Sequence, residues 1–534
     1  MWTMWPRAQA SRLPRLRWSA TTLVLSLVFL ARPWQSCFSQ VRHAFPEGPD
    51  KSNPRAPHVA AASMAMATMQ VEDLAIVAPV VDRFRAVTVK NVEELLKGYI
   101  DRSTGIKKLE FYRRLEDIKM AALIFPFRCS SYVMENLINW DADDLDSDPM
   151  YRLLFPTLAM LSEDHRQKLL DAQALQDPFM LEAVVKSIRD DLNPQPAGQL
   201  TLNKPKQEDL TGIQHKYVQT CLLFPKAGQT CHAYCTYCFR WAQFIGDEDI
   251  RLAQKDASGF YKYVSEKTDL TDVLVTGGDP LIMRVGLLRS YLGKFADPNF
   301  LPHIRNIRIG TRVLTFWPQR LTKDSDSSEL LDFLRSLVRE GGRSIDIMAH
   351  LGHDVELSTA QFQEAVQALQ DTGAVIRSQA PLMKGINDDA DVWARKWKRE
   401  VQLGIIPYYM FLARDTGAQG YFSVPIARAH QIYADAIRQS SGLARTARGP
   451  SMSCTPGKVE VTGIEIVNGQ RAFVLRFLQC RDPAWIGRVF FAKYSESAIW
   501  FDELEPLDGG SLLPWDDQGI LRQGTPEEVL LTPA

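Results

Sequence analysis

The sequence predicts an α/β protein whose central part is a partial, open (β/α)6 barrel, with a helical region before it and a small β-rich extension after it. Short apolar runs of strand length recur between residues 217 and 412, and stretches of helical period such as 327–339 and 359–370 separate them. Strands that alternate with helices pair in parallel through right-handed crossovers. Residues with reactive side chains also follow the predicted strands directly, as expected at the carboxyl ends of barrel strands. The predicted strands are 217–224, 272–275, 304–309, 345–349, 375–378 and 405–412.

The N-terminus has the composition of a targeting leader. Its first 46 residues contain arginines but no Asp or Glu, and the apolar stretch 21–31 lies within them. That stretch is shorter than the ~20 residues that span a bilayer. A basic segment with a short apolar core predicts a signal peptide, whereas an Arg-rich, acid-free segment predicts an organellar transit peptide. We therefore expect a two-part leader over residues 1–70, delivery to a plastid with the mitochondrion as the alternative, and no membrane segment in the mature form.

Composition excludes several classes of partner. The 534 residues carry a net charge of −1 and are 46% hydrophobic, which is typical of a globular chain with a large core. This balance gives no reason to expect nucleic acid or anionic lipid as a partner. Cysteines that are scattered singly do not form a disulfide framework, and they are typical of a reducing compartment. The scattered cysteines are Cys37, Cys129, Cys221, Cys454 and Cys480.

Three further cysteines form a compact motif directly after the first predicted strand. Cys231, Cys235 and Cys238 are separated by three and two residues, so one loop brings three thiolates together. A four-iron cluster normally takes four thiolates, and three ligands leave one iron with an open coordination position. A zinc site is the alternative, but His232 is adjacent to Cys231 and cannot easily reach the same metal, and no second C-x2-C follows. The loop therefore predicts an iron–sulfur cluster with an open iron.

The regions on either side of the barrel have other patterns. Upstream, the sequence is helical and charged, and Ser162-Glu163-Asp164 has the pattern of a helix N-cap followed by acids. Downstream of Lys458 the pattern becomes β-rich, and Asn468-Gly469 predicts a hairpin. We place the boundaries at 1–70 for the leader, 71–208 for the helical region, 209–424 for the barrel, and 425–534 for the C-terminal segment.

The cysteine spacing resembles that of the radical S-adenosylmethionine (SAM) superfamily, in which the open iron binds the amino and carboxylate groups of SAM. An ordered series of further motifs resembles the lysine 2,3-aminomutase family over residues 200–460. The series consists of Gly277-Gly278-Asp279-Pro280, Arg308-Ile309-Gly310-Thr311-Arg312, Pro318-Gln319-Arg320, His350-Leu351-Gly352-His353, Gln379 with Asn387-Asp388, Pro407-Tyr408-Tyr409 and Pro456-Gly457-Lys458.

The resemblance implies a cluster site and a SAM site. The three cysteines of the loop match the cluster ligands, and the glycines after the second strand allow a ligand to approach the backbone closely. A carboxylate there, that of Asp279, can balance an ammonium group. The residues that match the SAM-binding segments are Thr276, Gly277, Gly278, Asp279, His350 and Gln379.

The resemblance also implies a site for pyridoxal 5'-phosphate (PLP) and for a substrate. Lys458 matches the lysine that binds PLP covalently, and Lys216 and Arg312 match phosphate contacts. Arg240, two residues after the last cysteine, matches the arginine that binds the substrate α-carboxylate. The planar fork of a guanidinium suits bidentate binding of a carboxylate.

The sequence departs from the lysine-specific pattern at two positions. Lysine-specific members present two aspartates to the distal ammonium of the substrate, and the corresponding positions here are Arg414 and Ser451. A buried arginine that faces an ammonium is unfavourable. We therefore expect Arg414 to receive an acidic or neutral polar side chain, with glutamate as the leading candidate. The alternative is that Arg414 pairs with Asp415 or Glu460 and specificity is set elsewhere.

These features together predict a SAM- and PLP-dependent 2,3-aminomutase, an isomerase that moves the α-amino group of a small amino acid to the β-carbon. The alternatives are lysine as the substrate, or modification of a lysine on a protein partner. A non-catalytic scaffold is disfavoured by the intact cysteines, Gly277, Gly278, Arg240 and Lys458. We further expect a reductant such as ferredoxin or flavodoxin as a partner, and a homo-oligomer.

Overall fold

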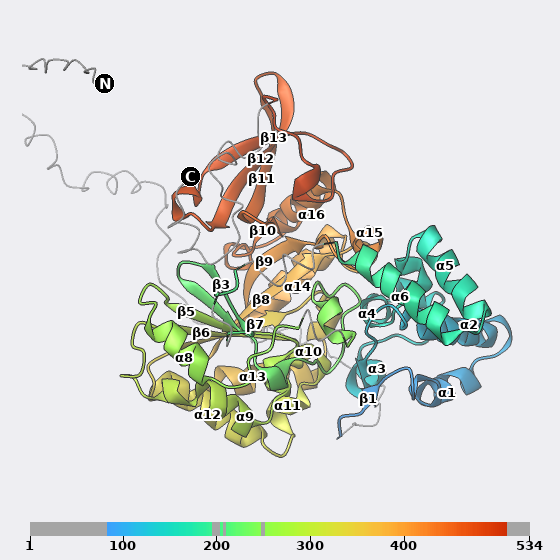
Figure 1. Ribbon diagram of the computed structural model, residues 1–534, viewed down its shortest axis with the longest axis horizontal. Helices are drawn as coiled ribbons and strands as arrows, with labels where there is room; N and C mark the ends of the chain where they lie inside the picture. Colours follow the sequence, from blue (N-terminus) through green and yellow to red (C-terminus); the bar gives the residue numbers. More distant parts are fainter. Residues whose placement is uncertain (1–82, 195–202, 207–209, 247–250, 510–534) are drawn as a thin grey trace, which may run out of the picture. The chain divides into compact units, whose positions relative to one another are not determined.

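The computed structural model describes residues 83–194, 203–206, 210–246 and 251–509, all of which belong to one compact unit (Figure 1). The leader predicted over 1–70 lies outside the described residues, so the leader and the plastid location stay predictions. Within the described ranges, no helix has the combination of length and apolar character that crossing a membrane requires.

The N-terminal part of this unit is mainly helical, as predicted. The N-cap predicted at Ser162 is confirmed, because its hydroxyl accepts a hydrogen bond from the backbone N–H of His165. The apolar faces of these helices form a core that also includes Ala233 and Trp241 of the cysteine-loop region. The helical region thus packs against the loop that carries the three cysteines. Its elements are β1 (Ala86–Val87), α1 (Val92–Arg102), α2 (Gly105–Ala121), β2 (Cys129–Ser130), α3 (Ser131–Asn136), α4 (Pro149–Leu154), α5 (Glu163–Ala174) and α6 (Pro178–Leu192).

A mixed sheet forms the centre, which confirms the α/β class. Among the described residues its strand order is β13-β12-β11-β10-β9-β8-β7-β6-β5-β4-β3. Neighbours from β4 to β10 pair in parallel, and the remaining pairs are antiparallel. Each predicted strand overlaps one of β4 to β9, so these predictions are confirmed. The strands are β3 (Ile213–Tyr217), β4 (Thr220–Leu223), β5 (Asp272–Val275), β6 (Asn306–Thr311), β7 (Ser344–His350), β8 (Val375–Leu382), β9 (Ile406–Leu412) and β10 (Arg448–Ser453).

Helices between the strands cover the sheet. The predicted helix 327–339 is confirmed as α12, whose Leu330, Phe333, Leu334 and Leu337 are buried at helical spacing. Each such side chain contributes about 1.5–3 kcal/mol when fully buried. In Figure 1, α8, α9 and α12 lie together beside β5 and β6. The helices are α8 (Ser258–Ser265), α9 (Val285–Leu292), α10 (Val313–Phe316), α11 (Gln319–Thr322), α12 (Ser327–Arg339), α13 (Ala360–Gln370), α14 (Ala390–Gln402), α15 (Gln419–Phe422) and α16 (Ile426–Arg438).

The C-terminal extension is β-rich, as predicted. β11 (Gly457–Val467) and β12 (Gln470–Cys480) form an antiparallel hairpin, and β13 (Val489–Lys493) pairs with β12. The hairpin predicted at Asn468-Gly469 is confirmed, and both residues have positive φ angles of 50° and 79°. A type I′ turn requires such angles at both central positions. Lys458 lies at the start of β11 and is therefore joined to the parallel part of the sheet through β10.

Candidate functional site

The cysteine loop follows β4 and is fixed by the N-terminal helical region. The backbone N–H groups of Tyr234 and Thr236 donate to the carbonyls of Arg128 and Leu153, at 2.8 and 2.9 Å. The guanidinium of Arg128 donates to the hydroxyl of Thr230 and to the carbonyl of Cys231, both at 3.0 Å. These contacts hold the loop in place independently of any metal.

The thiols of the loop fit an iron–sulfur cluster better than a single metal ion. Burial raises the pKa of all three thiols, and that of Cys238 rises to about 12, with the neighbouring Cys235 as the second cause. Such thiols become thiolates when a metal binds them. Across the described ranges, no three His, Cys, Asp or Glu side chains converge so that they could hold one ion. A four-iron cluster offers each thiolate a separate iron, so its ligands need not converge.

The glycines after β5 press directly on this loop. Gly278 donates its N–H to the carbonyl of Gly228 at 3.1 Å, and Asp279 donates to the carbonyl of Thr230 at 2.7 Å. A Cβ on Gly278 would lie 2.3 Å from the carbonyl oxygen of Thr230, and Gly277 has a φ of +148°. Only glycine permits this approach. The glycine pair therefore also positions the cysteine loop.

We expect Gly278→Ala to displace the cysteine loop, because overpacking against backbone costs about 1–3 kcal/mol. Iron bound after anaerobic reconstitution should fall below that of the wild type. Gly286→Ala is the matched control, because a Cβ there meets nothing within 4 Å on helix α9. Equal iron contents of the two variants would contradict this role of Gly278.

The carboxylate of Asp279 is engaged by hydrogen-bond donors of the protein itself. Its two oxygens accept hydrogen bonds from the Thr311 hydroxyl (2.7 and 2.8 Å), the Arg312 N–H (2.9 Å) and the Leu281 N–H (3.0 Å). Asp279 is 2% exposed. A carboxylate engaged in this way joins the end of β5 to the end of β6, and its role toward an ammonium group stays a prediction.

The carboxyl ends of the central strands carry polar groups close to the cysteine loop. His350 and Gln379 are register partners at the ends of β7 and β8, and the hydroxyl of Tyr237 lies 3.2 Å from Nδ1 of His350. Burial, followed by the charges of Arg312 and Lys396, lowers the pKa of His350 well below its usual value. These surroundings favour the neutral form of the His350 imidazole. His350, Gln379 and Thr276 are half-buried and accessible to a ligand.

Arg312 lies with the cysteine loop and not with the other residues expected to contact phosphate. Its Nη1 donates to the Tyr237 hydroxyl at 2.8 Å and to Sγ of Cys235 at 3.5 Å, and its Nη2 pairs with Glu356. These contacts do not support the predicted role of Arg312 as a phosphate contact, which stays a prediction. The sequence did not single out Tyr237 or Glu356, although Tyr237 stands between two of the cysteines.

Lys458 lies in a group of basic side chains that we call the cationic cluster. Its ammonium is 3.9 Å from the ring centre of Tyr409 and 5.1 Å from that of Phe411. Burial is the first cause that lowers the pKa of Lys458 well below its usual value, and neighbouring cations are the second. The cationic cluster consists of Lys216, Arg308, Arg414, Arg448, Lys458 and Arg481.

Among the described side chains, two members of the cationic cluster, Arg308 and Arg414, lie close to carboxylates, and the lysines do not. Burial, then Arg414 and Arg481, lowers the pKa of Lys216 to about 8. Arg308 has Asp272 at 3.4 Å and Arg414 has Asp415 at 3.5 Å. In the part of the chain that the structure describes, neither Lys216 nor Lys458 forms an ion pair. Such a site suits a phosphate-bearing ligand, and an uncharged lysine amine is a competent nucleophile. Sequence analysis included Arg308 in a motif but assigned neither Arg308 nor Arg448 a place beside Lys458, where the fold brings both.

Arg240 lies between the cysteine loop and the barrel strands. Its guanidinium carbon is 4.2 Å from the ring centre of Phe224, and its Nη2 donates to Gln243. Burial lowers the pKa of Arg240 to about 10, whereas Cys238 and Cys231 raise it. Its buried Nε has no hydrogen-bond partner within the described residues. The guanidinium of Arg240 therefore keeps an unused donor next to the cysteine loop.

Arg414 and Ser451 occupy different surroundings. The guanidinium carbon of Arg414 lies 5.6 Å from the ring centre of Phe239, the residue after Cys238. The charge of Arg414 also contributes to the lowered pKa of Lys216. The expected alternative pairing occurs with Asp415, whereas Glu460 pairs with Arg476. Ser451 is fully buried and donates its hydroxyl to the carbonyl of Met410 at 3.3 Å.

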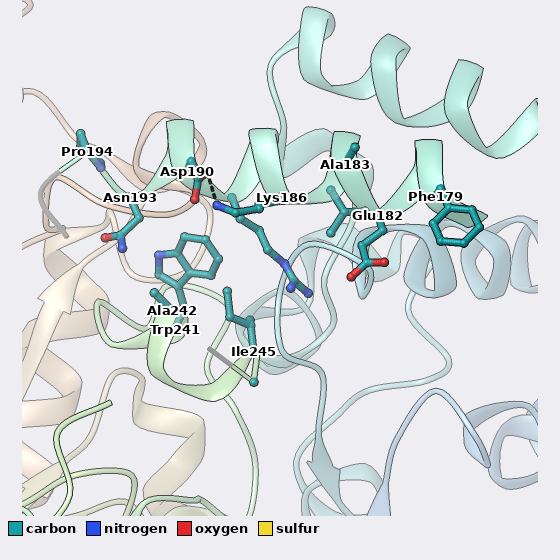
Figure 2. A pocket seen from close by; sticks show the side chains of 13 residues that line it. Phe179, Glu182, Ala183, Lys186, Asp190, Asn193, Pro194, Trp241, Ala242 and Ile245 are labelled. Carbon is teal, nitrogen blue, oxygen red and sulfur yellow. Dashed lines mark hydrogen bonds and ion pairs between the residues drawn. The ribbon is translucent and has the colours of Figure 1, made fainter. Parts of the chain in front are cut away.

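A cavity of about 780 Å³ opens beside the residues that follow Arg240 (Figure 2). Helix α6 lines it with Glu182, Lys186 and Asp190, and Trp241 and Ile245 line it from the segment after the cysteine loop. No member of the cationic cluster is among its lining residues. It is therefore separate from the site around Lys458.

Comparisons with known proteins agree with these features. No protein-family model matches the chain. A protein of Aquifex aeolicus (strain VF5), named provisionally as an L-lysine 2,3-aminomutase, is 30% identical over 383 residues, which are 72% of this chain and 88% of that protein. The L-lysine 2,3-aminomutase of Fusobacterium nucleatum is 26% identical over 57% of this chain and 67% of its own length. The glutamate 2,3-aminomutase of Clostridioides difficile is 26% identical over 52% of this chain and 61% of its own length.

Similarity to solved structures is weaker. A radical SAM methyltransferase from Sphaerobacter thermophilus aligns with a TM-score of 0.32 and 14% identity, over 57% of this chain and 88% of that one. At this TM-score the likeness supports no conclusion about the present fold.

Proposed function

This chain belongs to the lysine 2,3-aminomutase family and is an isomerase; on that premise, we propose that it moves the α-amino group of a small amino acid other than lysine to the β-carbon. The family uses a [4Fe–4S] cluster, SAM and PLP. When bound, the cluster and SAM supply a radical that removes hydrogen from carbon, and PLP holds the migrating amino group. The side chains of this chain bind and orient these groups and shield them from water.

One observation carries the proposal: Arg414 of the cationic cluster lies 5.6 Å from the ring of Phe239, which links the cationic cluster to the cysteine loop. Phe239 follows Cys238 directly, and its ring contacts Arg414. The charge of Arg414 lowers the pKa of Lys216, and the charge of Lys216 lowers the pKa of Lys458. Radical chemistry requires the reacting groups to be held close together and away from water. A thiolate cluster site and a buried lysine whose lowered pKa favours the nucleophilic amine fit an aminomutase.

The curvature of the sheet supports the open (β/α)6 barrel as the finer description of the fold. β3, which carries Lys216, and β11, which carries Lys458, are eight positions apart in the strand order. In a flat sheet with a strand spacing of about 4.8 Å, such strands would be about 38 Å apart. The charge of Lys216 nevertheless lowers the pKa of Lys458. This coupling supports a sheet that curls so that its two halves face each other.

Each residue then has a defined task in our proposal. Cys231, Cys235 and Cys238 bind the cluster, and Thr276, Gly277, Gly278, His350 and Gln379 line the SAM site. Arg240 binds the α-carboxylate of the substrate through its free donor. Lys458 attaches PLP through its uncharged amine, and Lys216, Arg308 and Arg448 neutralise the phosphate. The cluster needs an external reductant, for which we propose a ferredoxin or flavodoxin.

The substrate proposal rests on Arg414. As a member of the cationic cluster, Arg414 places positive charge where a lysine substrate would bring a second ammonium, and like charges in a partly buried site disfavour binding. Asp415 neutralises Arg414 only weakly, because the closest pair of atoms is Nε and Oδ1 at 3.5 Å. We therefore propose an acidic or neutral polar substrate side chain, with glutamate as the first candidate.

We expect Arg414→Asp to reduce turnover of the true substrate about 100-fold, because a lost charge-assisted contact costs roughly 3 kcal/mol. The assay is reconstituted, reduced enzyme with SAM, PLP and a panel of amino acids, followed by detection of the β-isomers. Arg438→Asp is the control, because Arg438 lies exposed at the end of α16. Unchanged turnover by Arg414→Asp, or conversion of lysine but not glutamate by the wild type, would refute the substrate proposal.

A further inference from the structure

Arg312 stands out because its positive charge is buried directly against a cluster ligand. The residue is 8% exposed, and its Nη1 lies 3.5 Å from Sγ of Cys235. The same atom donates to the hydroxyl of Tyr237 at 2.8 Å, and Nη2 donates to Glu356 at 2.5 Å. The guanidinium therefore has one side toward the sulfur and the other toward a carboxylate.

This arrangement is held from several directions. Glu356 is fully buried, and its Oε1 accepts hydrogen bonds from the N–H groups of Gly352 (2.7 Å) and His353 (2.9 Å). The guanidinium carbon of Arg312 lies 4.4 Å from the ring centre of Phe316, and its backbone N–H donates to Asp279. The charge is consequently fixed in place relative to Cys235.

Fold stability alone does not explain such a pair. Removing an arginine and a glutamate from water is costly, and apolar residues of the same size often stabilise a fold as well or better. A buried cation at a ligand sulfur has a direct effect on an iron–sulfur cluster, because hydrogen bonds to sulfur and local charge set its reduction potential. Reduction adds negative charge, so a nearby cation favours the reduced form.

We propose that Arg312 raises the reduction potential of the cluster through its hydrogen bond to Cys235, and that Glu356 limits this effect by partly neutralising the guanidinium. The pair thus sets how readily the external reductant delivers its electron. Arg312 and Glu356 are positioning residues in this scheme, because they act through a cluster ligand. The inference rests on the proposed cluster site but not on the amino-acid substrate or on PLP.

The test is an anaerobic potentiometric measurement on the full chain with reconstituted cluster, without SAM, PLP or amino acid. We expect Arg312→Gln to lower the equilibrium constant for reduction about tenfold, a shift of 59 mV for one electron. We expect Glu356→Gln to shift the potential in the opposite direction. Both substitutions break the same ion pair, so a merely structural role would move both potentials in the same direction. Shifts of the same sign, or an unchanged potential in Arg312→Gln, would overturn the proposal.

Arg312→Lys covers the case in which Arg312→Gln does not bind iron. Lysine keeps the positive charge but lacks the forked guanidinium. The reduction potential of the cluster in Arg312→Lys should therefore lie between those of the wild type and Arg312→Gln. In that case Glu356→Gln decides the matter, because a potential at or below that of the wild type would overturn the proposal. Opposite shifts in a chain that forms no β-amino acid would support this inference and refute the proposed function. A wild-type chain that binds no iron would refute both.

Discussion

Replacing Cys235 with alanine is expected to abolish cluster binding and, with it, all SAM cleavage. A four-iron cluster normally takes four thiolates, and this loop supplies three. The Cys235→Ala variant would supply two, which is too few to hold the cluster. Iron should fall from about four atoms per reconstituted chain to near zero. The brown absorption of the cluster and the release of 5'-deoxyadenosine from SAM should disappear together.

Cys221→Ala is the matched control for this experiment. Cys221 is a fully buried cysteine in β4, just before the loop, but it is not one of the three clustered residues. Its replacement should cost about 1 kcal/mol of stability and leave the iron content intact. Full iron in Cys235→Ala, or equal loss in both variants, would contradict the assignment of the loop.

Replacing Lys458 with alanine is expected to remove the yellow absorption of lysine-bound PLP and to reduce β-isomer formation at least about 100-fold. The side-chain amine of Lys458 is the group that forms this attachment. Without it PLP is no longer held in position, and misplacement of a reactant alone can lower a rate about 100-fold. Iron content should not change. Lys493→Ala is the control, because Lys493 is exposed on β13 and pairs with Glu505.

The lowered pKa of Lys458 gives the same experiment a pH signature. An ordinary lysine, with a pKa of about 10.4, is almost entirely charged at pH 8 and reacts slowly. Burial, followed by neighbouring cations, lowers the pKa of Lys458 well below that value, so its uncharged amine forms at lower pH than that of an ordinary lysine. The yellow absorption should therefore develop at lower pH in the wild type than an ordinary lysine would allow. Development only above pH 10, or retention in Lys458→Ala, would exclude Lys458 from this role.

The strands of the parallel sheet could be predicted because buried parallel strands are continuous apolar runs. β10 was missed for the same reason: Arg448–Ser453 contains little apolar sequence, and the residues form a strand because β9 and β11 provide partners on both sides. The boundaries of the domains stay predictions. The cap at Ser162 and the hairpin at Asn468-Gly469 were predictable because each depends on local chemistry alone.

The candidate site was predictable where residues are close in sequence and less so where the fold brings them together. The cysteine loop and the glycines after β5 are local motifs, and they lie against each other in the structure. Arg308 and Arg312 show the limit. Arg308 lies within β6, and its charge lowers the pKa of Lys458. Arg312 lies just after β6, which ends at Thr311, and its side chain donates to Cys235 instead. The direction of a side chain beyond a strand end depends on backbone angles that residue spacing does not reveal.

The most direct test of the function is an omission experiment on the reduced, reconstituted wild type with a panel of amino acids. We expect a β-amino acid to form from a substrate other than lysine only when SAM and PLP are both present. Because the reaction is an isomerisation, the β-amino acid should keep all the carbon and nitrogen atoms of the substrate. Formation of the β-isomer without SAM or without PLP would contradict the proposed function. Release of 5'-deoxyadenosine with no β-isomer from any amino acid would also contradict it, and would favour modification of a lysine on a protein partner.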